Sequence, residues 1–128
     1  TAHTYQKKIY YHDTIAAVVY YANYLKHLEE ARTEFFTDRD YSLCTAARRG
    51  IFFVVGHVDI RYKAPAYYQD VLIVTTTVAR VRSASVVFIQ QIAREGTVLV
   101  EAQATLVCVN RQFHSQPIPA ELKEVLLP

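Results

Sequence analysis

The chain has 128 residues, of which 52% are hydrophobic and 20% are charged, with a formal net charge of +2. A chain of this length can bury its own core, so we predict a single domain over residues 1–128. No run of about 18 apolar residues is free of charges, so we expect no membrane span. The weak net charge does not indicate a nucleic-acid partner.

The two cysteines do not share the spacing of a metal site. Cys44 lies in a predicted loop or short helix, and Cys108 lies in a strand pattern with apolar neighbours. We interpret both as buried free thiols. Free thiols are typical of a reducing compartment, so we predict a cytoplasmic location.

A strand, a short connection and a long helix are predicted first. Residues 4–12 are rich in Tyr and Ile, which predicts a strand, and small or β-branched residues over 13–19 predict a connection. An amphipathic helix then begins at Asn23, a suitable N-cap, and ends near residues 37–40. Glu29, Glu30 and Arg32 are expected to form pairs at i,i+3-type spacing on a solvated or subunit-facing helix surface. The residues predicted to form its buried face are Tyr24, Leu28, Ala31 and Phe35.

Four strands are predicted after this helix. A connection over 41–50, with one helical turn, leads to a strand over 51–63 that ends before Pro65, since proline lacks the N–H that a sheet ladder needs. The other predicted strands cover residues 71–82, 85–94 and 97–110, and a short amphipathic segment over 121–127 is placed on the surface.

This order predicts an α+β fold, in which a curved five-stranded, mainly antiparallel sheet wraps one long central helix. Such a sheet leaves open edges. Pairing of edges between two copies would cover them, so we expect a homodimer at least.

The segment from Asp13 to Phe35 reads D-T-I-A-A-V-V-Y-Y-A-N-Y-L…E-E-A-R-T-E-F. It resembles the hotdog-fold acyl-CoA thioesterases, and most closely the Tol–Pal-associated and 4-hydroxybenzoyl-CoA thioesterase group. Later segments agree in order: Y-K-A-P-A from Tyr62, D-V-L from Asp70, the Arg82-Ser83 turn, and the strand that ends in V-C-V. The resemblance covers about residues 5–120. It implies a hotdog fold, a homodimer or homotetramer, and hydrolysis of acyl-CoA thioesters without a metal or bound cofactor.

The resemblance also implies how the site is built. Family members typically read D-T-D-A-x-G-V-V-Y-[HY]-x-N-Y, and the second aspartate acts as a general base or nucleophile on the thioester carbonyl. The backbone N–H at the position of Tyr21 polarises that carbonyl, since open amides at a helix start stabilise an oxyanion. Tyr20 and Asn23 are expected at the substrate, although packing and helix capping explain them as well.

This sequence departs from the family pattern at the second aspartate. Ile15 stands there, and the family glycine before Val18 is missing, so the turn is one residue short. Isoleucine cannot abstract a proton or attack a carbonyl. Three explanations stay open: Asp13 takes over the carboxylate role, the sequence differs here from the natural chain, or the protein binds acyl-CoA or an acyl carrier with impaired or no hydrolysis. We assign Asp13 as the candidate carboxylate, with Glu29 or Glu30 in reserve.

A second part of the predicted site binds CoA. Arg80 and Arg82 alternate along the third strand and meet Ser83 and Ser85 at the following turn. An arginine fork matches phosphate oxygens well. In the family that the chain resembles, this turn contributes to the nucleotide and pantetheine surface, often across a subunit boundary. A solvated strand end would explain the same residues.

Overall fold

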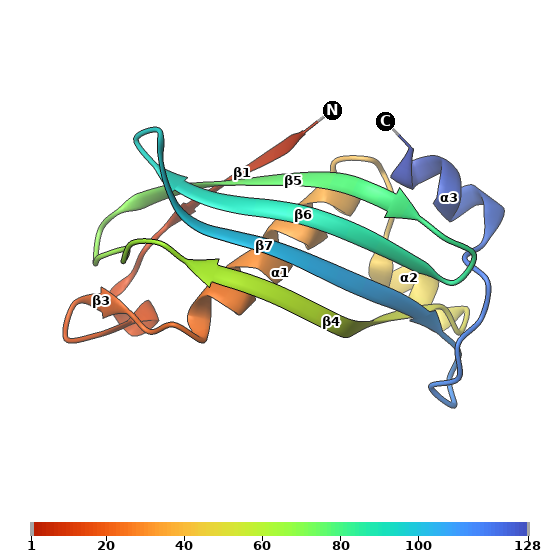
Figure 1. Ribbon diagram of the computed structural model, residues 1–128. Helices are drawn as coiled ribbons and strands as arrows, with labels where there is room; N and C mark the ends of the chain where they lie inside the picture. The colour runs from red at the N-terminus through yellow and green to blue at the C-terminus, as the bar shows by residue number, and fades with distance from the viewer. Residues whose placement is uncertain (1, 128) are drawn as a thin grey trace.

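A computed structural model describes residues 2–127. A five-stranded antiparallel sheet, in the order β1-β5-β6-β7-β4, curves along the long helix α1 (Figure 1). The strands of this sheet are β1 (His3–Lys8), β4 (Phe52–Tyr62), β5 (Val71–Val81), β6 (Ser85–Arg94) and β7 (Thr97–Val109). The helices are α1 (Asn23–Thr37), α2 (Leu43–Arg48) and α3 (Ala120–Leu126). The predicted α+β fold is confirmed. The predicted domain also includes Thr1 and Pro128, which lie outside the described residues.

The core lies between α1 and the sheet. The four residues predicted for the buried face of α1 are all buried. β7 lies between β6 and β4, and its residues alternate between a buried face and a more open one, as predicted. An aromatic cluster closes the far end of the core, where the Phe35 ring meets the edge of Phe88 at a centroid distance of 5.5 Å. Because α1 packs so closely, its N-terminal turn is held at one end of the sheet (Figure 1).

The structure differs from the prediction between β1 and α1. β1 ends at Lys8, because Ile9 turns into the core and its N–H bonds to the carbonyl of Asp70 rather than to a strand partner. The 3-10 helix η1 (Tyr11–Asp13) follows, so the predicted strand over residues 4–12 is too long.

The predicted connection over residues 13–19 contains a small hairpin of β2 (Thr14–Ile15) and β3 (Val18–Val19). Its turn residues, Ala16 and Ala17, have φ angles of 52° and 67°. Two consecutive left-handed residues are typical of the tightest hairpin turns. This turn explains how the chain closes without the family glycine.

Three further predictions need correction. Asn23 is the first residue of α1 and Ala22 is the N-cap, so Asn23 is not the helix cap. α3 does not simply lie on the surface, because Leu122 and Leu126 are buried in the core. Both cysteines are free, as predicted, but Cys44 is exposed, because the short α2 buries only Ala46.

The bounds of the remaining strands agree with the prediction to within one residue. In the part of the chain that the structure describes, no helix is long and apolar enough to cross a membrane.

Candidate active site

Asp13 is fully buried at the end of η1, beside the first turn of α1. Its Oδ2 accepts the backbone N–H of Tyr10 at 3.0 Å. Its backbone carbonyl accepts the N–H of Tyr20 at 3.3 Å and the side-chain amide of Asn23 at 2.8 Å. The hydrogen bond from Asn23 therefore holds Asp13 next to the start of α1.

Cationic groups from β1, η1 and α1 surround the Asp13 carboxylate. Lys26 Nζ lies 3.2 Å from Oδ1, and Lys7 Nζ lies 3.8 Å from Oδ2. The Nε2 atoms of His12 and His27 lie 3.8 Å and 3.9 Å from Oδ1. Burial raises the pKa of Asp13, but the hydrogen bonds from the Tyr10 N–H and Lys26, with smaller contributions from Lys7 and His27, outweigh it, so the pKa lies below its ordinary value. Asp13 is therefore ionised at neutral pH.

His27 extends this cluster on the β1 side of α1. Its Nδ1 lies 3.3 Å from Glu30 Oε1, and Lys7 Nζ lies 3.8 Å from the same oxygen. Burial lowers the pKa of His27, although the carboxylates of Asp13 and Glu30 oppose this effect. The predicted site did not include His27. Its spacing of three residues from Glu30, which places both on one helix face, is visible in the sequence but does not by itself indicate a site.

Open backbone amides lie next to Asp13. Among the described residues 2–127, no hydrogen-bond acceptor is found for the N–H groups of Tyr21 and Ala22. Tyr21 is 61% exposed, and its ring lies 4.8 Å from that of Tyr20 and 6.2 Å from that of Tyr62. The N–H of Tyr21 is thus open to an incoming carbonyl oxygen.

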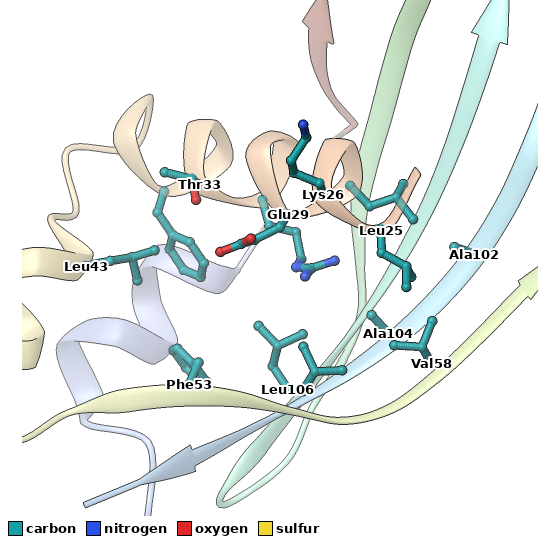
Figure 2. Close-up of a pocket in the computed structure, with 14 residues that line it drawn as sticks. Leu25, Lys26, Glu29, Thr33, Leu43, Phe53, Val58, Ala102, Ala104 and Leu106 are labelled. Carbon is teal, nitrogen blue, oxygen red and sulfur yellow. The ribbon is translucent and has the colours of Figure 1, made fainter. Parts of the chain in front are cut away.

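An apolar groove of about 520 Å³ lies on the other side of α1, between the helix and strands β4 and β7 (Figure 2). In Figure 2 the carboxylate of Glu29 points from α1 into this groove, whereas the Lys26 ammonium points away from it. Asp13 and Glu29 are therefore on opposite sides of α1, and Glu30 lies on the side of Asp13. The apolar residues that line the groove include Leu25, Leu28, Phe53, Val58, Ala104 and Leu106.

Arg32 also lines this groove, so the prediction of a solvated surface is wrong for this residue. Arg32 is only 8% exposed, and among residues 2–127 it forms no ion pair within 4.0 Å with Glu29 or Glu30. Its Nη1 donates to Oε1 of Gln90 at 2.9 Å. The reason is geometric: Arg32 follows the buried Ala31 and points at the sheet, where Gln90 on β6 receives it.

The residues predicted to bind CoA lie far from Asp13 in the same chain. Lys8 pairs with Val71 at the start of β5, and Arg80 follows nine residues later, roughly 30 Å along the strand. Arg80, Arg82 and Ser83 are exposed at the β5–β6 turn, and Ser85 is half-buried there. One chain therefore does not bring these residues to Asp13 and Tyr21.

Known proteins resemble this chain over nearly all of its length. A family model described as thioesterase-like superfamily matches residues 11–126. The acyl-CoA thioester hydrolase YbgC of Escherichia coli is 38% identical over 105 residues, which are 80% of this chain and 78% of that protein. The long-chain acyl-CoA thioesterase FadM of Escherichia coli is 32% identical over 119 residues, or 91% of this chain and 89% of that protein.

The fold agrees with solved structures. The crystal structure of a 1,4-dihydroxy-2-naphthoyl-CoA thioesterase from Synechocystis superposes with a TM-score of 0.91 at 24% identity, over 98% of this chain and 96% of that one. At this identity the match supports the fold alone. It confirms the predicted hotdog architecture.

Proposed function

The chain belongs to the thioesterase-like superfamily, and we infer from its relatives that it is an acyl-CoA thioester hydrolase. The observation that carries this conclusion is the similarity to two acyl-CoA thioesterases over most of both chains. Loss of hydrolysis, which Ile15 suggested as an alternative, is not favoured by these relatives. The reaction adds water to the thioester carbonyl, breaks the C–S bond and releases a free acid and CoA.

For the carbonyl, we propose that the backbone N–H of Tyr21 binds the thioester oxygen. This amide has no hydrogen-bond acceptor among the described residues, belongs to an exposed residue and lies next to the first turn of α1. The positive end of the helix dipole adds to its effect, so the negative charge that develops on the oxygen is stabilised. The rings of Tyr20 and Tyr62 lie beside the Tyr21 ring, and the side-chain amide of Asn23 donates to the carbonyl of Asp13.

We propose Asp13 as the catalytic carboxylate. It is ionised, and its backbone carbonyl is hydrogen-bonded to Tyr20 and Asn23, on either side of Tyr21. As a base it would take a proton from the attacking water, and as a nucleophile it would attack the carbonyl carbon itself. Its oxygens are covered in the free protein. The Lys26 side chain is 46% exposed, so a bound substrate can displace it and uncover Oδ1.

Glu29 is the rival carboxylate, because it is exposed and points into the apolar groove (Figure 2). An acyl chain in that groove would bring its thioester end near the start of α1. Glu29 can therefore reach water in the groove without any rearrangement, which Asp13 cannot.

We propose further that a second copy of the chain completes the site, in a homodimer or homotetramer. Arg80, Arg82, Ser83 and Ser85 lie too far from Tyr21 in their own chain, so they would bind the phosphates and pantetheine of CoA held by a neighbouring subunit. The open edges of β1 and β4 leave room for such pairing. The free cysteines support a cytoplasmic location.

A thiol-trapping assay tests this function. The purified protein is offered short, long and aromatic acyl-CoAs, and the release of free CoA is followed. We expect turnover with at least one class. Binding of every acyl-CoA without release of CoA would instead identify an acyl-CoA-binding protein.

A further inference from the structure

Arg32 is a buried cation with most of its hydrogen-bonding capacity unused. A guanidinium has five N–H donors, and in Arg32 one of them, on Nη1, bonds to Gln90 at 2.9 Å. Among residues 2–127, no carboxylate oxygen lies within 4.0 Å of the Arg32 guanidinium. Burial is unfavourable for a charged group and lowers the pKa of Arg32, and the charge of Glu29 opposes this effect only in part.

A rigid hydrogen-bond chain holds Arg32 in place. Gln90 is itself buried, and its Nε2 donates to the carbonyl of Leu28 and to Oγ1 of Thr76, each at 3.0 Å. These two bonds leave only Oε1 for Arg32. The guanidinium is therefore fixed between α1 and β6 before any ligand arrives, which reduces the entropy lost on binding.

The unused donors face the groove. Within the described part of the chain, the fully covered side-chain nitrogens without a hydrogen-bond partner are on His3 and His27. The nitrogens of Arg32 without a partner are not among them, so they keep some accessible surface. The unpaired nitrogens of Arg32 are thus open to the groove that this side chain lines. The surrounding wall is apolar, as Leu106 and Phe53 are in Figure 2, so an anion there would be poorly screened by water.

The other charged residues of the groove do not satisfy Arg32. Lys26 points away from the groove and toward Asp13. Glu29 is exposed, and its charge raises the pKa of Arg32, but no ion pair within 4.0 Å joins the two side chains. The groove therefore holds a fixed guanidinium with no carboxylate oxygen of residues 2–127 within 4.0 Å, although the Glu29 carboxylate also points into this groove.

We propose that this groove accepts acyl groups that carry a carboxylate at the end remote from the thioester, and that Arg32 binds this carboxylate. The inference rests on the proposed function, because it places the thioester at Tyr21. Arg32 follows Tyr21 by eleven residues, roughly 16 Å along a helix axis, and arginine side chains lean toward the N-terminus. The remote carboxylate would thus lie on the order of 10 to 15 Å from the thioester carbonyl. The substrate class is a medium-length acyl-CoA with a terminal carboxylate.

Two acyl-CoAs of equal chain length, one ending in a methyl group and the other in a carboxylate, provide the test. We expect the wild-type kcat/KM to favour the carboxylated substrate by about 10- to 100-fold, as a charged hydrogen bond would give. Arg32→Met keeps a similar apolar body and should abolish this preference. Arg61→Met removes a positive charge from the outer face of β4, and this variant should keep the preference for the carboxylated substrate. Equal rates in the wild type, or a preference that survives Arg32→Met, would overturn the proposal.

A second measurement separates this proposal from the hydrolysis itself. Calorimetric titration with non-hydrolysable thioether analogues of both substrates should give the same order of affinities in the wild type. If neither thioester is hydrolysed while the carboxylated analogue binds more tightly, the activity fails and the Arg32 site stands. If Arg32→Met does not fold, Gln90→Glu supplies an anion to Arg32 and should lower the preference in the titration. Analogues that bind equally well to the wild type would contradict the site.

Discussion

Lys26 has a half-exposed side chain, and its ammonium lies 3.2 Å from Oδ1 of the buried Asp13 carboxylate. This ion pair joins the segment before α1 to the helix itself, and it lies on the opposite side of α1 from the groove that Glu29 faces. The molecule thus holds two candidate carboxylates in different surroundings. One is ionised, fastened and covered, and the other is open to an apolar channel.

Replacement of each carboxylate by its amide tells the two apart. If Asp13 is the working group, Asp13→Asn should lower kcat by about 100-fold or more, the usual contribution of a general base. Glu29→Gln should then change kcat far less. The measurement is steady-state CoA release by both variants, with circular dichroism to show that each is folded. Unchanged turnover in Asp13→Asn together with a loss in Glu29→Gln would assign the reaction to Glu29.

The Tyr21 amide can be tested by removal of its hydrogen. Proline lacks the backbone N–H, so Tyr21→Pro should lower kcat by about 100- to 1,000-fold, the typical loss for one oxyanion donor. Ala22→Pro is the matched control, since Ala22 already has a φ of −70°, which suits proline. It removes the neighbouring amide and leaves that of Tyr21. Equal losses in the two variants would show that the local backbone, and not this N–H, matters.

The long periodic elements could be predicted from the sequence, because burial dictates their patterns. The alternation in β7 and the spacing of Tyr24, Leu28, Ala31 and Phe35 have one structural solution each. The segment between β1 and α1 could not, since its conformation depends on distant partners. The backbone of Ile9 bonds to the loop before β5. The side chain of Asn23 does not cap the helix but donates to the Asp13 carbonyl.

The candidate site also has one feature that the sequence predicts and one that it does not. The open amide of Tyr21 follows from the position of the helix start, which the sequence predicts well. The burial of Arg32 does not, because its partner Gln90 lies 58 residues away on β6. A charged residue on a helix reads as solvated unless that partner is known.

The hairpin turn of Ala16 and Ala17 offers a test of the shortened loop. Left-handed backbone costs an alanine about 1–2 kcal/mol, whereas asparagine and glycine tolerate it. Ala16→Asn with Ala17→Gly should therefore raise the free energy of unfolding by about 1 kcal/mol. Ala47→Gly in α2, where the backbone is helical, should lower it by a similar amount. Urea titrations measure both changes. Destabilisation by the turn variant would mean that these alanines do not adopt left-handed angles.

His27 should make the stability depend on pH. Burial holds its pKa below the ordinary value of 6.5 in the folded protein, while Asp13, Glu30 and Lys7 face it. Between the folded pKa and 6.5, the unfolded chain binds more protons than the folded one. The contribution of His27 to the free energy of unfolding is therefore fully present above pH 6.5, and it falls as the pH drops through this window. The lowered pKa of Asp13 adds a separate loss below its ordinary value of 3.8.

His27→Gln isolates the histidine contribution, because glutamine cannot take up the proton. Urea titrations from pH 8 to pH 5 should show a smaller loss of stability in this variant than in the wild type. His114→Gln is the control, since His114 is exposed on the loop after β7. It should leave the pH dependence as it is. A wild-type curve that is flat over this range, or one that His27→Gln leaves equally steep, would show that His27 is not the titrating group. The ion pairs of Asp13 with Lys7 and Lys26 would then hold the cluster together.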